Sequence, residues 1–361
     1  MSKFTCPFCL STFNRNEIEY YCLECGNTVK GKLFSRGPVR CSCGGYATKR
    51  TCPKCLSAIP AEALETPNYM FSIVGAAGSG KTMFTAAMIR ELRDGGLYLT
   101  VGSETMETRN HQMEMERLIY KYNEVPPCTN QDEVFPQIWY VRNNREINRN
   151  DVPTYTFTIY DEAGESFEKM DPNAMVYRHI YESTAIILTI DSVGFFEAAN
   201  GGSANPEVLD MLCRGEVNDK ENKVAFIKSV IDYIKTARGI KTMNKIDIPV
   251  AVVFTKMDTV LSHPEFDNQM SVKNNKLPIR DEKVDSSELK QVDSEIRSWL
   301  LANGADELIR SFDLNFKEYM LFGVSSFGEA PKDGHTLPEK MQPHRILDPM
   351  IWLLWKEKII K

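Results

Sequence analysis

The chain has 361 residues, of which 42% are hydrophobic and 25% charged, a composition typical of a globular protein with one large domain and one small one. Its formal net charge of −6 argues against a surface built mainly for nucleic acid. No charged-then-apolar leader opens the chain, and its apolar runs are far shorter than the roughly 20 residues of a membrane span. We therefore expect a cytoplasmic protein with no membrane span.

Eight of the ten cysteines lie within the first 55 residues, in four close pairs. Close pairs in a cytosolic chain are typical of metal sites, and four thiolates complete the tetrahedron that Zn²⁺ prefers. We therefore predict a zinc-ribbon module over residues 1–60 with two four-cysteine sites. In sequence order the sites are Cys6, Cys9, Cys22 and Cys25, and then Cys41, Cys43, Cys52 and Cys55.

The pairing of the cysteines is not fixed by their spacing. We favour the sequential arrangement because each half then forms a self-contained ribbon, but an interleaved one, first pair with third and second with fourth, stays open. A module this small cannot be held by burial alone, so metal binding would supply its folding free energy. Residues 1–66 carry nine Lys/Arg and five Asp/Glu, an excess that two Zn(Cys)₄ centres would offset. We expect the ribbons to dock a partner protein or the neighbouring domain rather than nucleic acid.

Two prolines, Pro60 and Pro67, and a lack of periodicity between them mark a linker over residues 61–68 that leads to a large domain over residues 69–361. This domain is organised around the segment GAAGSGKT, Gly75 to Thr82. An apolar run precedes the segment and a helical stretch over residues 81–93 follows it, which is the order of a phosphate-binding loop. Backbone N–H groups would surround a phosphate beside the helix dipole. They belong to Gly75, Ala76, Ala77, Gly78, Ser79 and Gly80.

Two side chains at the end of this loop complete the predicted phosphate site. Lys81 would reach the β- and γ-phosphates, and the Thr82 hydroxyl would hold Mg²⁺. A later apolar strand, over residues 154–160, ends in Asp161-Glu162-Ala163-Gly164-Glu165. The Asp161 carboxylate would hold the same Mg²⁺, and the Gly164 N–H would contact the γ-phosphate.

The remaining pattern predicts an α/β sheet of the P-loop NTPase type with helices on both faces. Besides the strand before the loop, we predict strands over residues 97–101, 137–141, 154–160, 183–191, 248–254 and 319–324, with 137–141 and 154–160 forming an antiparallel hairpin. We predict helices over residues 104–122, 223–238, 286–312 and 346–360, and insertions near 97–125, 194–222 and 261–285. We expect the last helix to cover the sheet rather than lie on a membrane surface.

Four signals stand at predicted strand ends: GAAGSGKT, DEAGE, TKMD (Thr255 to Asp258) and GVSS (Gly323 to Ser326). Together they resemble the Ras-like, TRAFAC-class GTPases, over most of residues 69–361. The cysteine ribbons and the segment HRILDPMIWLLW add a resemblance to the bacterial double-GTPase type 2 family, which is associated with predicted bacterial signalling or conflict systems. The resemblance implies a GTP- and GDP-binding molecular switch that hydrolyses GTP and acts on a protein partner.

The resemblance also implies roles for residues at the base. Asp258 would accept both N–H groups on the guanine edge, and the Lys256 stem would lie over the ring, within the segment that starts at Thr255. Backbone groups of Ser325 and Ser326 would approach the base. Thr129 is the predicted switch threonine that closes on Mg²⁺, with Thr105 and Thr108 as alternatives.

Three positions depart from the family pattern. Ala77 stands where Ras proteins have glycine, and its methyl group would obstruct an arginine from an activating partner. Glu165 stands where many members place the glutamine that orients water, and a carboxylate cannot donate the amide hydrogen bond. Ser326-Phe327 replaces the usual alanine-lysine. These departures predict slow hydrolysis without a partner.

Two other functions fit the same residues. In an ATPase, Asp161 would hold Mg²⁺ and Glu162 would be the catalytic base. In a nucleotide-gated interaction module, hydrolysis would be negligible and the ribbons would be the docking surface. The sequence assigns no effector, pathway or oligomeric state.

Overall fold

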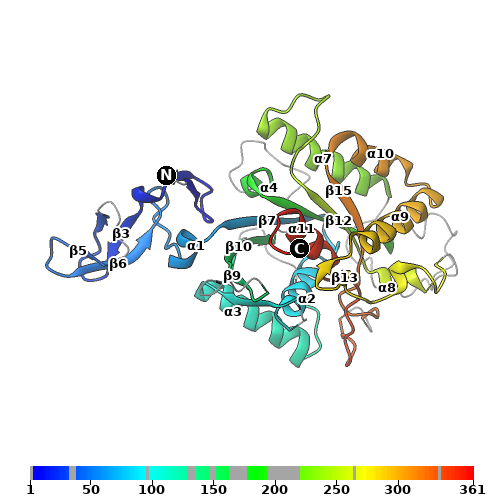
Figure 1. Ribbon diagram of the computed structural model, residues 1–361, viewed down its shortest axis with the longest axis horizontal. Coiled ribbons are helices and arrows are strands. Elements are labelled where there is room, and N and C mark those ends of the chain that lie inside the picture. The colour runs from blue at the N-terminus through cyan, green and yellow to red at the C-terminus, as the bar shows by residue number, and fades with distance from the viewer. Residues whose placement is uncertain are drawn as a thin grey trace. The chain divides into compact units, whose positions relative to one another are not determined.

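The computed structural model describes residues 3–31, 38–94, 97–127, 135–145, 152–161, 177–193, 220–262, 266–331 and 335–361. The chain forms two compact units (Figure 1). One comprises Met1–Tyr69, Thr100–Arg109 and Phe135–Ile159, and the other comprises Met70–Leu99, Asn110–Val134 and Tyr160–Lys361.

The cysteine-rich residues form two small antiparallel sheets. The hairpin of β1 (Lys3–Thr5) and β2 (Thr12–Asn14) comes first, followed by the 3₁₀ turn η1 (Arg15–Glu17). A four-stranded sheet in the order β4-β3-β6-β5 contains β3 (Glu19–Cys22), β4 (Thr28–Lys30), β5 (Val39–Arg40) and β6 (Tyr46–Thr51). The core of this module is small: Phe4, Phe13, Ile18 and Tyr20 pack with four buried cysteines.

The predicted linker contains a helix, α1 (Ala61–Glu65). Ala63 and Leu64 on this helix are buried and belong to the core of the cysteine module. Five residues make little more than one helical turn, which is too short for a 3.6-residue periodicity to show in the sequence.

One seven-stranded sheet runs in the order β15-β12-β11-β7-β10-β9-β8. Its strands are β7 (Asn68–Gly75), β8 (Leu99–Ser103), β9 (Gln137–Asn143), β10 (Thr154–Asp161), β11 (Ala185–Asp191), β12 (Val250–Thr255) and β15 (Tyr319–Gly323). The pairs β7–β11, β11–β12 and β12–β15 are parallel. The pair β9–β10 is antiparallel, so the predicted hairpin is confirmed.

Helices cover both faces of the parallel part of the sheet. On one face, Leu188, Val252 and Phe254 pack in one core with α7 (Lys220–Arg238), α9 (Ser286–Ala302) and α10 (Asp306–Asn315). Residues that alternate with these point to the other face, where the Phe322 ring lies 5.9 Å from that of Trp352. Figure 1 shows α9 and α10 beside β15, and α11 (Asp348–Lys356) contacts β12. The predicted α/β fold class is confirmed.

Most predicted helices form within a few residues of their expected bounds. Among the residues that the structure describes here, the other helices are α2 (Lys81–Asp94), α3 (Met106–Glu116), α4 (Arg178–Glu182) and α8 (Met257–Leu261), with a π-helical turn over Arg117–Lys121. The region 261–285 holds a 3₁₀ turn, η6 (Ser271–Lys273), and the short pair β13 (Ile279–Arg280) and β14 (Lys283–Val284). The expected helix over 286–312 is two helices, α9 and α10, because the chain turns at Gly304, whose φ is +67°.

The last helix, α11, is apolar because it is buried. Met350, Ile351, Leu353 and Leu354 are fully enclosed and Trp352 nearly so. Its predicted role as a cover for the sheet is therefore confirmed. Among the described residues, none of the helices combines the length and apolar character that crossing a bilayer requires.

A buried arginine ties the segment before α11 to the residues after α8. The Arg345 guanidinium donates to the carbonyl oxygens of Ser271, at 2.8 Å, and Asn274, at 2.6 Å. It also pairs with Asp348 at 2.6 Å and with Glu288 at 3.1 Å. Burial raises the pKa of Asp348 to about 7, and the attraction of Arg345 opposes this rise. These bonds hold the region 271–275 against the C-terminal segment that contains Arg345.

Replacing this arginine should destabilise the fold strongly. Arg345→Met would leave Asp348 buried without its cation, so we expect a loss of about 3–5 kcal/mol in the free energy of unfolding, measured in urea. The matched control is Lys228→Met, which breaks an exposed pair with Glu307 and should leave the free energy of unfolding nearly unchanged. Equal, small losses of unfolding free energy in the two variants would show that the buried pair does not hold these two segments together.

Candidate functional site

The phosphate-loop candidate begins where β7 meets its neighbour β11. A Cβ atom added to Gly75 would lie 2.1 Å from the Thr189 hydroxyl oxygen and 2.5 Å from that of Ser79. The two hydroxyls are themselves hydrogen-bonded at 2.9 Å. Only glycine fits at position 75, and the close approach fixes the start of the loop against β11.

The rest of the loop turns through two glycines with positive φ. Gly78 has a φ of +71° and Gly80 a φ of +79°, values that L-residues with a side chain rarely adopt. The Ser79 N–H donates to the Ala76 carbonyl at 3.2 Å, which closes the turn. Helix α2 begins directly afterwards at Lys81, so the predicted order of strand, glycine turn and helix is confirmed.

The Lys81 side chain folds back over the loop. Its ammonium donates to the carbonyl oxygens of Gly75, at 2.8 Å, and Ala76, at 3.0 Å, and the residue is largely buried. A cation is thereby held beside the N-terminus of α2, where backbone N–H groups also favour negative charge. These donors are the groups that a phosphate would need, so the loop residues fit a nucleotide phosphate.

Part of the predicted magnesium site lies within the described residues. Thr82 is in the first turn of α2, and Asp161 is the buried last residue of β10, the strand beside β7 in the sheet. A hydroxyl and a carboxylate are oxygen ligands of the kind that Mg²⁺ takes. The predicted residues Thr129, Glu162, Gly164 and Glu165 lie outside the described residues.

The TKMD segment is anchored to the phosphate loop. Thr255 ends β12, and its hydroxyl donates to the Ser79 carbonyl at 2.7 Å. Lys256 then adopts a left-handed conformation, with φ +58°, and its ammonium pairs with the Asp191 carboxylate at 2.7 Å. The structure therefore brings two motifs together that are about 175 residues apart in sequence.

Asp258 and Ser325 meet at the other end of this segment. Burial raises the pKa of the Asp258 carboxyl, while a hydrogen bond from the Ser325 side chain and the charge of Lys256 oppose the rise. Ser325 is itself buried, and its hydroxyl accepts the Gly328 N–H at 2.9 Å. The structure thus brings the TKMD segment and the loop after β15 together, and the adjacent Ser326 is half-buried.

A cavity of about 640 Å³ opens beside Asp258. Phe327 lines it, and so do Asn275 and His344, which come from outside the recognised motifs. His344 forms two backbone hydrogen bonds with Ser325, of 2.8 and 3.0 Å, and burial lowers the pKa of its imidazole. No spacing in the sequence relates these residues to Asp258, so sequence reasoning missed them.

Three further residues at the site also escaped the sequence reasoning, although a signal existed for two of them. Thr189 and Asp191 are polar residues at the carboxyl end of an otherwise apolar strand, the position where α/β folds place ligand contacts. The third, Lys223 on α7, donates its ammonium to the Asp191 carbonyl at 2.9 Å.

The eight cysteines form two groups of four, but in neither of the arrangements weighed from sequence. One group is Cys6, Cys9, Cys52 and Cys55, and the other is Cys22, Cys25, Cys41 and Cys43. The sequential pairing is therefore wrong, and so is the interleaved one. The groups are nested, with the outer pairs together and the inner pairs together.

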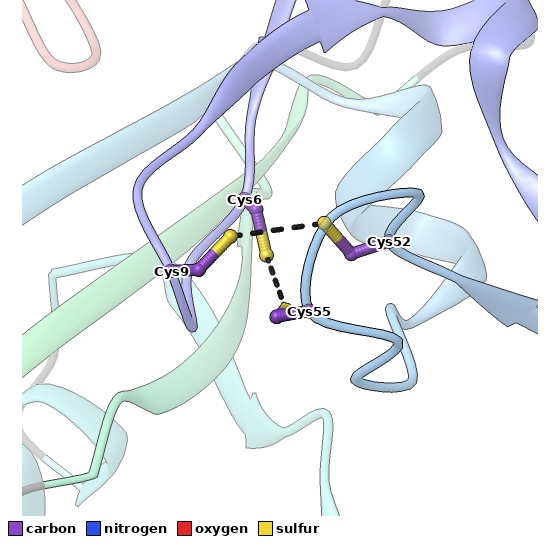
Figure 2. A group of neighbouring side chains, drawn as sticks. All are labelled: Cys6, Cys9, Cys52 and Cys55. Atoms are coloured by element: carbon purple, nitrogen blue, oxygen red, sulfur yellow. Dashed lines mark hydrogen bonds between the residues drawn. The ribbon is translucent and has the colours of Figure 1, made fainter.

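Strand pairing explains the nesting. Strands β3 and β6 are antiparallel and place Cys22 opposite Ala47, which brings the loop after β3 beside the turn between β5 and β6. The inner four cysteines stand on these two loops. The outer four stand on the β1–β2 turn and the turn after β6, and Figure 2 shows their sulfurs pointing toward one another from two separate loops.

Both groups fit a tetrahedral metal ion. In the outer group the sulfurs of Cys6 and Cys55 are 3.8 Å apart, as are those of Cys9 and Cys52, and all four lie within 4.8 Å of one another. In the inner group the distances are 3.7 Å (Cys22–Cys43) and 3.5 Å (Cys25–Cys41). Four thiolates about 2.3 Å from a central Zn²⁺ would lie about 3.8 Å from one another, so the donor sets suit zinc. Backbone N–H groups of Phe8 and Lys54 also point at Cys6 and Cys52 sulfurs, as expected around thiolates.

Double substitutions distinguish the three pairings. In Cys6→Ser/Cys52→Ser both changes fall in one nested group, so we expect the chain to retain one of two zinc ions under chelator competition. In Cys6→Ser/Cys22→Ser the changes fall in different groups, and we expect both ions to be lost. Metal content per chain is the measurement. The sequential pairing requires the opposite result, and the interleaved pairing requires both variants to lose both ions.

Comparison with known proteins yields similarity of shape only. No protein-family model matches the chain, and no curated protein matches it in sequence. The solved structures that resemble it include the Arl6 BBS3 small GTPase from Trypanosoma brucei with bound GppNp, at 11% identity and a TM-score of 0.34, covering 81% of this chain and 99% of that one. They also include the signal recognition particle receptor SRb-GTP/SRX complex from Chaetomium thermophilum, at 13% identity and a TM-score of 0.31, covering 73% of this chain and 93% of that one. At these values neither likeness identifies a family.

Proposed function

We propose that the chain binds GTP and GDP with Mg²⁺ and hydrolyses GTP as a molecular switch. One observation carries this proposal: the hydrogen bond from Thr255 to Ser79, which holds the TKMD segment against the phosphate loop. A phosphate site and a base site are then separated by one short segment. A nucleotide has the same two ends, joined by a ribose.

The base end favours guanine over adenine. The ionised Asp258 carboxylate offers two acceptor oxygens beside a cavity, and guanine presents two adjacent N–H donors on one edge. Adenine has no such pair of donors, and a site built around a hydrogen-bonding partner rejects a ligand that lacks it. A hydrogen bond from the Ser325 hydroxyl stabilises the ionised carboxylate.

Residues at the proposed phosphate site supply the positive charge that GTP hydrolysis needs. Lys81 and the N–H groups of the loop would bind the β- and γ-phosphates, and Thr82 and Asp161 would hold Mg²⁺, which stabilises the developing negative charge. Thr129 and Gly164 would close on the γ-phosphate, and Glu165 would face the attacking water. Because a carboxylate cannot donate the hydrogen bond of an amide, hydrolysis is slow until a partner contributes.

The proposed switch works by ordering two loops, those that contain Thr129 and Gly164, when GTP is bound. Contacts from the γ-phosphate to Thr129 and Gly164 would order their segments in the GTP state, and a partner protein reads that order. The two zinc ribbons provide a docking surface for such a partner. This arrangement suits a role in bacterial signalling or conflict response.

Changing the base-binding carboxylate should change the base that is bound. Asp258→Asn would lose two charge-assisted hydrogen bonds to guanine, so we expect about a hundredfold weaker GTP binding. Binding of xanthosine triphosphate should rise, because an amide can donate to the carbonyl that replaces the amino group of guanine. Fluorescent analogues in the presence of Mg²⁺ give the affinities, and Asp247→Asn, in an exposed ion pair, is the control.

The same experiment carried out with ATP gives the result that would contradict guanine specificity. Equal or tighter ATP binding that Asp258→Asn leaves unchanged would remove TKMD as a specificity element. The ATPase with Asp161 as magnesium ligand and Glu162 as base would then be the better assignment. In that case Glu162→Gln would abolish ATP turnover while leaving ATP binding intact.

Guanine binding should also weaken on acidification. Because burial raises the pKa of Asp258 above the ordinary 3.8, the carboxylate takes up a proton at a higher pH than an exposed aspartate does. Protonation removes an acceptor, so GDP affinity should fall as the pH drops through that raised pKa. His344 lines the same cavity, and burial lowers the pKa of its imidazole, so it takes up a proton at a lower pH than an exposed histidine does. Titration of GDP binding tests this, and a decline of equal size in Asp258→Asn would refute it.

A further inference from the structure

Asp191 is a buried carboxylate at the junction of the proposed phosphate and base sites. It is the last residue of β11, opposite Thr255 in the parallel register with β12, and it is 4% exposed. A carboxylate so enclosed needs partners for its charge, because leaving one unpaired in the interior is costly.

Each polar group of this residue has a defined partner. One carboxylate oxygen accepts the Val193 N–H at 2.9 Å, and the other pairs with the Lys256 ammonium at 2.7 Å. The Asp191 backbone carbonyl accepts from the Lys223 ammonium at 2.9 Å, and Lys223 is 5% exposed. The carboxylate is thereby held in one orientation, with Lys256 as its cationic partner.

Lys256 is fixed at both ends of its side chain. At the backbone it adopts the left-handed conformation, which is unfavourable for a non-glycine residue and persists only where neighbours enforce it. The neighbours are Thr255, bonded to Ser79, and Met257, whose N–H donates to the Val324 carbonyl at 3.1 Å. At the far end the ammonium is held by Asp191, so the stem between them has little freedom.

We propose that Asp191 is a positioning residue for guanine nucleotides: it holds the Lys256 stem in the place where the base lies. This inference rests on the proposed function. Asp191 does not touch the nucleotide. It contributes to affinity because a lysine that is already ordered loses no further side-chain entropy when the ring packs on it.

A double-mutant cycle tests the inference on the full chain with its zinc. Asp191→Asn keeps an acceptor for Val193 and removes the charge that holds Lys256, and Lys256→Met removes the ammonium while keeping an apolar stem. We expect each variant to bind fluorescent GDP about tenfold more weakly, and the double variant to bind no more weakly than either single one. Asp247→Asn is the matched control, since its ion pair with Arg238 is exposed and away from the site.

A second ligand separates positioning from damage to the fold. Pyrophosphate with Mg²⁺ uses only the phosphate loop, so its affinity should be unchanged in Asp191→Asn if the residue acts through Lys256. A parallel loss of pyrophosphate and GDP binding would overturn the inference, and so would additive losses in the cycle or wild-type GDP affinity in Asp191→Asn.

If Asp191→Asn does not fold, Lys256→Met carries the pyrophosphate comparison alone: a loss confined to GDP supports the inference, and unchanged GDP affinity overturns it. A wild-type chain that does not prefer GDP to ADP would instead refute the proposed function itself.

Discussion

The close approach of Gly75 to β11 is the constraint on which the proposed nucleotide site depends. With no side chain at position 75, the Ser79 and Thr189 hydroxyls can meet, and the loop is drawn onto the end of the parallel sheet. Thr255 then reaches the carbonyl of the same Ser79. Parallel strands end at one edge of a sheet, so a loop fixed there lies beside every other strand end that carries a functional group. Lys81, Thr255 and Asp191 share one neighbourhood for this reason.

The cavity beside Asp258 is lined in part by segments that belong to none of the sequence motifs. Arg345 binds the carbonyl oxygens of Ser271 and Asn274, and the His344 backbone pairs with Ser325. These contacts join the C-terminal segment, the region after α8 and the loop after β15. Arg345 is a buried cation paired with Asp348 and Glu288, and breaking such a pair is costly because it leaves a buried charge without a partner. The cavity beside Asp258 is therefore shaped by segments far from it along the chain.

The cysteine module illustrates how topology overrides spacing. Each close pair of cysteines makes half a metal site wherever it stands, because two thiolates on one tight turn face the same way. The halves that join are decided by β3 and β6, whose antiparallel pairing sets the inner loops side by side and leaves the outer two to meet. A self-contained ribbon in each half is a reasonable expectation for separate units, but these strands join the two halves in one sheet.

The sequence by itself determined the features that depend on neighbouring residues. The glycine turn before Lys81, the buried strands β11 and β12, the β9–β10 hairpin and the number of four-cysteine groups all follow from local pattern, because backbone conformation and side-chain periodicity are set within a few residues. The tertiary structure alone decided the contacts between distant segments: the nested cysteine pairing, the Asp191–Lys256 ion pair and the place of His344 in the cavity beside Asp258. Each of these contacts depends on which strands pair and which helix covers them. The local sequence around a carboxylate, a lysine or a histidine does not indicate which distant residue it will contact.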